Sequence, residues 1–388
     1  MHAPAAARSS HGGPSTSVVA GRLVLEDRVA PGRIVISGDL ITAVEPDASA
    51  ADGNYVCPGF IDLHVHGWGG HDALAGAAGL DGMARALLGR GVTSFLPTAD
   101  TAAIGTLAAF AADVRRWSAS VRDDRAEPLG INLEGPFLSL ARKGAQDATS
   151  MRLPAEVDRG VLAPLLDRLA IITIAPELPG APDLIRWFAG AGVTVSLGHS
   201  DASAAEAEQG IRAGARSTTH LFNAMSGLDH HAPGLAATAL ADDSVYVELI
   251  ADGLHVDPLL WPIVFRTKPS GRVVLVSDAV ALAGGSDGRA TLGGQDVEVR
   301  DGRCTLVADG RLAGSVIALD TAVRNLVAHD VPIPVAVRAA TANPVDLLGI
   351  VGRGRIVPGQ LADLVELDGD LQVRRVMKRG RWHSTDGP

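Results

Sequence analysis

Histidine and carboxylate side chains close a series of short apolar segments in the middle of this chain. His64 and His66 end FIDLHVH, Glu134 ends the apolar part of GINLEGP, and His199 and His220 end SLGH and STTH. Histidines at positions i and i+2 of a strand project to the same side, and imidazole nitrogens with a carboxylate oxygen suit a divalent transition metal. Taken alone, the first pair fits a metal site and two hydrogen-bonded histidines equally well. Three ligands from three separate segments are a stronger signal, so the sequence predicts a divalent metal site, with zinc as the expected ion.

Two further polar residues follow apolar segments and could carry the chemistry. Asp278 ends the apolar run of VVLVSDA, and a carboxylate there could take a proton from an attacking water and pass it to a leaving group. It could instead be one more metal ligand or a helix N-cap. His255, in ADGLHV, could polarise a substrate carbonyl, or it could be a loop histidine that faces solvent. The sequence contains no G-x-S-x-G motif, so covalent catalysis by serine is not predicted.

The elements that must position these residues repeat eight times. Most of the apolar segments are followed by a stretch rich in alanine, leucine and arginine, which is typical of a helix. Eight strand–helix repeats predict an α/β fold of the closed (β/α)8 TIM-like type, in which chemistry takes place at the carboxyl ends of the strands. The rival, an open doubly wound sheet, is not supported, because no GxGxxG follows a first strand. The eight segments begin at Phe60, Thr93, Gly130, Ile171, Thr194, Ser217, Val245 and Val273.

The two ends of the chain have a different sequence pattern from the middle. Short strand-like runs separated by glycine, proline and aspartate occupy residues 18–57 and recur in residues 350–388. Neither end has enough strands to bury a core, so we expect them to meet in one small β-sandwich domain beside a barrel of residues 58–349. Residues 1–17 are expected to be a disordered tail. A glycine-rich strand pair, residues 290–307, is predicted as an insertion after the eighth strand.

Composition limits the kinds of partner. The 388 residues are 47% hydrophobic and 20% charged, which is typical of a globular protein. Lys+Arg total 34 against 44 Asp+Glu, a net charge of -10, and aromatic residues are only 4%. Without a basic stripe, neither nucleic acid nor an anionic membrane is an expected partner. No apolar run reaches the roughly 18 residues of a membrane span, and two cysteines are too few for a disulfide framework. We therefore expect a cytoplasmic protein.

Several of these segments, taken in order, resemble one family. PGFIDLHVHGWGG, LEGPFLSLARKGAQD, SLGHSDA, THLFNAMSG, ADGLHV, LVSDAVALAG, RLAGS and the closing GRGRIVPGQLADLVELD are similar to the N-acetylglucosamine-6-phosphate deacetylases of the amidohydrolase superfamily. The resemblance covers residues 18 to 380. It implies a metal-dependent barrel with a small sheet domain, a homodimer, and hydrolysis of N-acetyl-D-glucosamine 6-phosphate to D-glucosamine 6-phosphate and acetate. Other substrates for such a barrel would be a cyclic amide or an acylated amino acid, and a barrel without catalysis would be a sugar-binding protein.

The resemblance also implies roles for single residues. Glu134, His199 and His220 would bind the main metal, and Asp278 would be the acid and base. Some members of the family have Gln and Asn in place of His64 and His66 and use one metal, so both imidazoles together make a second metal possible, with Glu134 as the bridge. Residues implied around the sugar are Ala145, Gln146, Asn223, Ala224, His255, Leu312, Ala313 and Gly314.

One position departs from the family pattern. Family members carry an arginine two residues before a Pro-Gly pair, where it reaches the substrate phosphate, often that of the neighbouring subunit. This chain has His231 there, and an imidazole cannot form the two parallel hydrogen bonds that a guanidinium donates to a phosphate. His231 could still bind the substrate phosphate when it is protonated, or Arg142 and Lys143 could bind it instead. The alternative substrates are N-acetylgalactosamine 6-phosphate and an N-acetyl sugar without phosphate.

Overall fold

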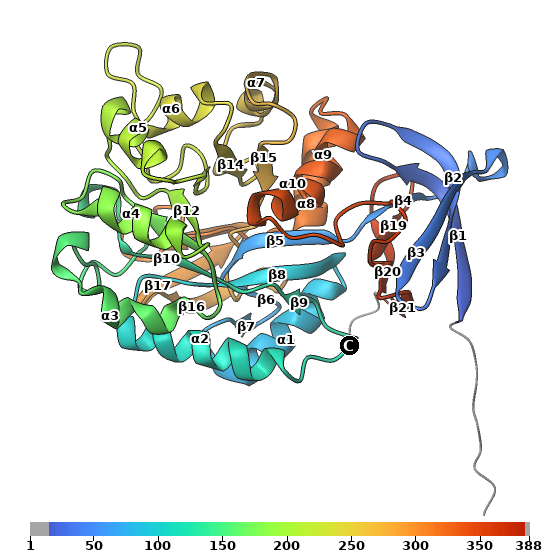
Figure 1. Cartoon of the computed structure of the whole chain (residues 1–388), viewed down its shortest axis with the longest axis horizontal. Helices are drawn as coiled ribbons and strands as arrows, with labels where there is room; N and C mark the ends of the chain where they lie inside the picture. Colours follow the sequence, from blue (N-terminus) through green and yellow to red (C-terminus); the bar gives the residue numbers. More distant parts are fainter. Residues whose placement is uncertain (1–14, 385–388) are drawn as a thin grey trace, which may run out of the picture.

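A barrel of parallel strands forms the centre of the molecule in the computed structural model, which describes residues 15–384 (Figure 1). Eight strands follow one another around it in sequence order, each paired with the next. The predicted (β/α)8 barrel is confirmed, and each strand overlaps its predicted segment. The strands are β5 (Phe60–Val65), β8 (Val92–Ala99), β10 (Ile131–Phe137), β11 (Leu169–Ile174), β12 (Thr194–Leu197), β13 (Ser217–Thr218), β14 (Tyr246–Leu249) and β15 (Val273–Leu275).

The barrel closes just beyond the last strand. A bridge joins Val65 to Ala279, the Asp278 amide donates to the His64 carbonyl at 2.8 Å, and the His66 amide donates to the Ala279 carbonyl at 2.9 Å. These backbone contacts place the carboxyl ends of β5 and β15 side by side. Polar residues from the first and the eighth strand therefore share one end of the barrel.

Helices cover the outside of the barrel because each buries one apolar stripe. In α1, Leu80, Met83, Ala84 and Leu87 are buried at helical spacing, and α5 begins with a capping box between Ser203 and Glu206. Figure 1 shows α1 and α2 on one side of the barrel strands and α5, α6 and α7 on the other. The helices are α1 (Gly76–Leu88), α2 (Ile104–Ser118), α3 (Arg159–Leu162), α4 (Ala181–Gly190), α5 (Ala204–Arg212), α6 (Leu235–Ala241), α7 (Trp261–Thr267), α8 (Leu319–Ala328), α9 (Ile333–Ala339) and α10 (Ala342–Leu348).

Both ends of the chain form a second, seven-stranded sheet, as expected. Its order is β21-β20-β19-β4-β1-β2-β3, and the antiparallel pairing of β4 with β19 joins the two ends. Side chains from both halves, including Leu23, Ile36, Leu364 and Met377, share one small core. The strands are β1 (Thr16–Val24), β2 (Val29–Ser37), β3 (Leu40–Pro46), β4 (Tyr55–Pro58), β19 (Leu364–Leu367), β20 (Val373–Lys378) and β21 (Arg381–Ser384).

Two details differ from the expected organisation. The first strand already begins at Thr16, two residues before the expected boundary, because the β1–β2 ladder continues to the pair Thr16–Ser37. Residues 1–14 of the expected tail lie outside the described residues. The insertion has three antiparallel strands instead of two, β16 (Gly288–Leu292), β17 (Gln295–Arg300) and β18 (Arg303–Leu306). A short hairpin of β6 (Gly67–Trp68) and β7 (His71–Asp72) and the edge strand β9 (Glu127–Pro128) complete the strands of residues 15–384.

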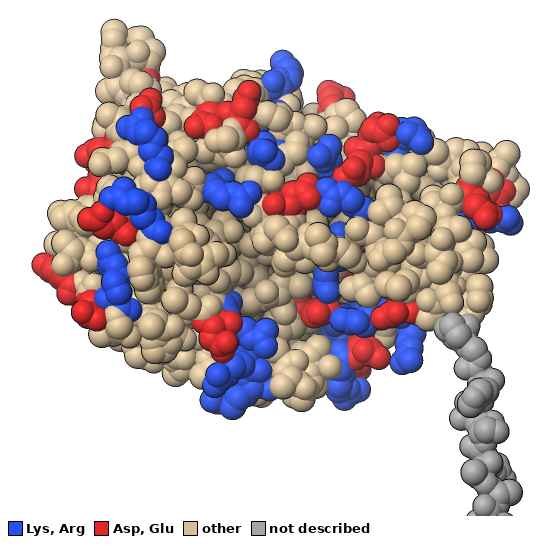
Figure 2. Space-filling view, viewed as in Figure 1, with Lys and Arg blue, Asp and Glu red and all other residues tan. Residues whose placement is uncertain are grey.

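The surface carries charges of both signs. Figure 2 shows Lys and Arg side chains interspersed with Asp and Glu over the face in view. Within residues 15–384, no helix is both long and apolar enough to cross a membrane.

Candidate active site and metal centre

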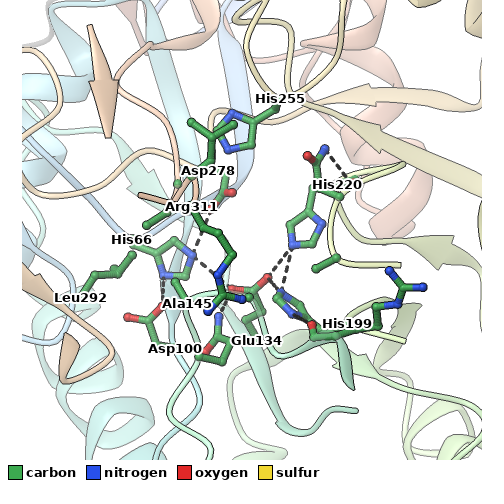
Figure 3. Close-up of a pocket in the computed structure, with 18 of the residues that line it drawn as sticks. His66, Asp100, Glu134, Ala145, His199, His220, His255, Asp278, Leu292 and Arg311 are labelled. Carbon is green, nitrogen blue, oxygen red and sulfur yellow. Dashed lines mark hydrogen bonds and ion pairs between the residues drawn. The ribbon is translucent and has the colours of Figure 1, made fainter. Parts of the chain in front are cut away.

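Six of the predicted site residues meet at the carboxyl end of the barrel, and Figure 3 labels all of them except His64. His64 lies on β5 and His66 directly follows this strand, Glu134 lies on β10, and His199, His220 and Asp278 follow β12, β13 and β15. The backbone of these last three residues has a positive φ, at 45°, 31° and 50°. Residues other than glycine rarely adopt this conformation, and it concentrates at functional sites. Each of these three strands therefore ends in a tight turn that carries a site residue.

The first cluster consists of Glu134, His199 and His220, all buried. The Nε2 atoms of His199 and His220 lie 2.9 and 2.8 Å from Oε1 of Glu134 and 3.2 Å from each other. Two imidazole nitrogens therefore converge on one carboxylate oxygen. This is the donor arrangement that a divalent metal requires.

The second cluster shares Glu134 and adds the histidine pair of β5. Nε2 of His64 and Nε2 of His66 are 3.2 Å apart, and they lie 3.7 and 3.5 Å from the two carboxylate oxygens of Glu134. Asp278 approaches the same two nitrogens at 3.5 and 3.2 Å. In each cluster the possible ligand atoms lie within 4.8 Å of one another. Nitrogen and oxygen donors that are buried and lie this close together fit a metal in either position.

Second contacts fix which ring nitrogen faces the centre. Nδ1 of His64 lies 3.2 Å from Glu248, and Nδ1 of His199 contacts the Arg142 carbonyl at 2.8 Å. Nδ1 of His66 lies 3.2 Å from Asp100, close enough for an ion pair but without a hydrogen bond. Such partners orient a ligand histidine and raise its basicity. The same Glu248 oxygen also accepts the backbone N–H of His220 at 3.2 Å, so one carboxylate contacts a histidine of each cluster.

Sequence reasoning missed Glu248 and Asp100. Each had a signal, since Glu248 is a single acidic residue in an apolar strand segment, VYVELI, and Asp100 directly follows TSFLPTA. Buried carboxylates are rarely unpaired. That rule could have marked both as partners of a buried base.

The electrostatics of the centre are dominated by burial and by opposite charges. Burial alone would raise the pKa of Glu134, but His199 and His64 hold that pKa well below its ordinary value. Burial would likewise raise the pKa of Asp278, and His64 and His66 lower it instead. Both carboxylates are therefore ionised at neutral pH. Asp278 in this state can accept a proton.

A cavity of about 290 Å³ opens above the two clusters. The substrate-binding residues expected from the sequence line it, with His231 as the exception. His231 is exposed in the loop before α6 and does not belong to the cavity wall. Asp100, Leu292 and Arg311 line it without having been predicted. The predicted residues in the wall are Ala145, Gln146, Asn223, Ala224, His255, Leu312, Ala313 and Gly314.

Side chains around the cavity hold one another in place. The Gln146 amide nitrogen donates to Oε2 of Glu134, and the Gln146 amide oxygen accepts the Thr101 N–H at 2.7 Å. His255 contacts Asp252 through Nδ1 at 2.7 Å. Burial would lower the pKa of His255, but this contact raises it. His255 therefore carries a proton to higher pH than a free imidazole does.

Comparison with known proteins places the chain among deacetylases. The Amidohydrolase family profile matches residues 55–383. The N-acetylglucosamine-6-phosphate deacetylase of Bacillus subtilis (strain 168) is 38% identical over 83% of both chains. The N-acetylgalactosamine-6-phosphate deacetylase of Escherichia coli O157:H7 is 36% identical over 90% of this chain and 94% of the relative.

Solved structures agree with this similarity. The N-acetylglucosamine-6-phosphate deacetylase of Thermotoga maritima superposes with a TM-score of 0.88 at 30% identity, over 94% of this chain and 99% of that chain. A mutant of the Mycobacterium smegmatis enzyme, in complex with N-acetyl-D-glucosamine-6-phosphate, superposes with a TM-score of 0.87 at 34% identity, over 95% and 99%.

Proposed function

We propose that this chain, which belongs to the amidohydrolase family and within it to the N-acetylglucosamine-6-phosphate deacetylases, hydrolyses N-acetyl-D-glucosamine 6-phosphate to D-glucosamine 6-phosphate and acetate. It is a hydrolase that acts on an amide. The observation that carries the proposal is the buried cluster of Glu134, His199 and His220, with Asp278 beside it on the wall of a sugar-sized cavity.

The metal we propose is a divalent ion, with zinc as the best match to these nitrogen and oxygen donors. Glu134, His199 and His220 would hold the main ion, and His64 and His66 a second one with Glu134 shared between them. When bound, the ion supplies Lewis-acid polarisation of the substrate carbonyl and makes an attacking water more acidic.

Asp278 is the proposed acid and base. Its Oδ1 lies 3.2 Å from His66 and the residue lines the cavity, so an attacking water between substrate and cluster is within its reach. Asp278 takes one proton from that water and later gives it to the amine that leaves. His255, protonated through its contact with Asp252, donates a hydrogen bond to the oxygen that becomes negative.

The remaining cavity residues position the sugar. The backbone at Ala145 and the turn Leu312–Gly314 form walls of the cavity, and Asn223 with Ala224 forms another. Gln146 holds Glu134 through its side chain and contacts the sugar through its backbone. His231 does not line the cavity of its own chain, and by the resemblance the residue at this position often reaches the phosphate of the neighbouring subunit, so His231 would act from a second subunit.

An acetate-release assay tests the substrate. The four compounds are N-acetylglucosamine and N-acetylgalactosamine, each with and without 6-phosphate. We expect the highest kcat/KM on N-acetylglucosamine 6-phosphate. Greater turnover of the galacto phosphosugar would favour the activity named for the Escherichia coli relative, and equal turnover without phosphate would contradict the phosphate requirement.

The assembly and location follow from the same proposal. A homodimer is expected, and light scattering coupled to size exclusion measures it directly. We place the protein in the cytoplasm, because a phosphorylated sugar carries a dianion that does not cross a bilayer unaided.

A further inference from the structure

Two arginine side chains, Arg142 and Arg311, line the cavity, and no lysine within residues 15–384 does so. Arg142 belongs to the LARKGAQ segment, which the sequence had already marked. Arg311 was not predicted. It is far from Arg142 in the sequence and lies in the turn that follows β18. Figure 3 shows its side chain among those that surround the cavity.

The turn that carries Arg311 is held by backbone hydrogen bonds. The Leu306 amide donates to the Arg311 carbonyl at 2.8 Å, and the Gly310 amide donates to the Leu306 carbonyl at 2.9 Å. Directly after Arg311, residues Leu312 to Gly314 form part of the cavity wall. The base of the Arg311 side chain is therefore fixed relative to the proposed sugar site.

Asp309 orients the guanidinium group. Its Oδ2 accepts from Nε of Arg311 at 2.8 Å and lies 2.7 Å from Nη2. A guanidinium has five N–H groups, so this contact leaves three of them for another acceptor. Arg311 is half-exposed, with 53% of its side-chain surface accessible, which places the group at the cavity mouth.

We infer that Arg311 binds the 6-phosphate of the substrate, an inference that rests on the proposed function. The acetamide must reach Asp278 at the floor of the cavity, and the phosphate lies at the other side of the sugar ring, toward the mouth. A guanidinium suits a phosphate because it can form two parallel charge-assisted hydrogen bonds. Asp309 is a positioning residue that presents the remaining N–H groups to the phosphate.

The test compares Arg311→Met with a matched control, Arg289→Met. Arg289 is also an exposed arginine paired with a carboxylate, Glu298 at 3.1 Å, on the same inserted sheet, but it does not line the cavity. KM and kcat are measured on N-acetylglucosamine 6-phosphate and on N-acetylglucosamine, and binding of inorganic phosphate is measured by calorimetry.

Arg311→Met is expected to raise KM for the phosphosugar by about tenfold or more, the usual loss for charge-assisted hydrogen bonds. The kcat for the phosphosugar should stay within about twofold of the wild-type value. The KM for N-acetylglucosamine should change no more than in Arg289→Met, and the binding of inorganic phosphate should weaken. Arg311→Lys should recover part of the lost affinity for the phosphosugar, since it restores the positive charge but cannot form two parallel hydrogen bonds.

Two results would overturn the inference. One is a KM for the phosphosugar within twofold of that of Arg289→Met. The other is an equal loss on both sugars, which would show that Arg311 only supports the cavity wall. A wild-type protein that releases acetate from neither sugar contradicts the proposed function instead, and in that case calorimetry with phosphate still decides whether Arg311 binds the anion.

Discussion

Glu134 is the residue on which both clusters depend. One of its oxygens faces His199 and His220 at 2.9 and 2.8 Å, and both oxygens approach the histidine pair of β5. Since a carboxylate shared in this way serves both positions, its loss has a wider effect than the loss of any single imidazole.

The first prediction concerns metal content. Glu134→Gln, His199→Gln and His220→Gln should each lose bound metal and activity, because each removes a ligand from the main cluster. His64→Gln should remove only the second metal ion and leave one ion per chain, so its effect on the rate should be smaller. Mass spectrometry of the purified proteins gives the metal content. A His220→Gln variant with full metal content and full rate would show that the ligand set is wrong.

The second prediction concerns proton transfer. Asp278→Asn keeps the shape of the side chain but cannot accept a proton, so turnover should fall by at least ~10²-fold. Metal content should stay near that of the wild type, because Glu134, His199 and His220 are unchanged. Near-native acetate release by this variant would remove Asp278 from the role of base.

Elements determine how firmly these residues are held. Gly314 has a φ of +69°, and a Cβ there would lie 2.9 Å from the Asp278 carbonyl oxygen. That same carbonyl accepts the Ser315 amide at 2.7 Å. The turn after β18 therefore packs directly against the backbone that carries the proposed base.

The third prediction uses this close approach. Gly314→Ala should displace the Asp278 backbone and lower kcat by about tenfold or more, since a misplacement of about 1 Å can cost 10²-fold. Gly310→Ala is the control, because Gly310 has a φ of +74° and nothing within 4 Å of its Cβ position. Both variants lose roughly 1–2 kcal/mol to the left-handed backbone, and only the first should lose turnover. Equal turnover in the two variants would contradict the prediction.

The secondary-structure elements also show which parts of the structure could be predicted from the sequence and which could not. The eight strands were predictable because they are apolar runs that end in polar residues, and the barrel rule then placed those residues together. The third strand of the insertion was missed although two turns, Gly293-Gly294 and Asp301-Gly302, divide the segment. Arg311 was missed for another reason. It follows a strand of the inserted sheet, and spacing along the chain does not encode that the turn after this strand lines the cavity.

At the scale of the whole molecule, a charge cluster joins the barrel to the sheet domain. Glu127 on β9 lies 3.3 Å from Arg353, 3.5 Å from Lys378 and 3.1 Å from Arg379. Burial would raise the pKa of Glu127, but these three cations lower it. Its ionised form therefore stabilises the folded state.

The fourth prediction follows from this cluster. Glu127→Gln should lower the free energy of unfolding by about 2 kcal/mol at neutral pH, because it leaves buried cations without their partner. A depressed carboxyl pKa contributes stability above the unfolded pKa and loses it as the pH falls through the folded pKa. The deficit should therefore shrink below the ordinary glutamate pKa. Denaturation at several pH values measures it, with Glu45→Gln as the control, since the exposed pair of Glu45 and Arg33 should contribute less than about 1 kcal/mol.

The last prediction concerns two subunits together. His231 lies in the loop of residues 227–233, which protrudes from the body at the upper left of Figure 1, and it is exposed and outside its own cavity. If that loop reaches the cavity of a partner, His231→Arg should lower KM for the phosphosugar by about tenfold, through a bidentate contact that imidazole cannot form. The sugar without phosphate should not respond.

Mixed dimers show whether His231 acts on the cavity of the partner subunit or on the cavity of its own subunit. One dimer pairs an otherwise wild-type subunit with a subunit that carries both Asp278→Asn and His231→Arg, so that the only active cavity faces the arginine of its partner. The second dimer places His231→Arg in the active subunit and leaves His231 in the inactive one. A lower KM in the first dimer alone means that the loop acts across the interface. A lower KM in the second dimer alone would mean that His231 serves its own chain, against its exposed position outside that cavity.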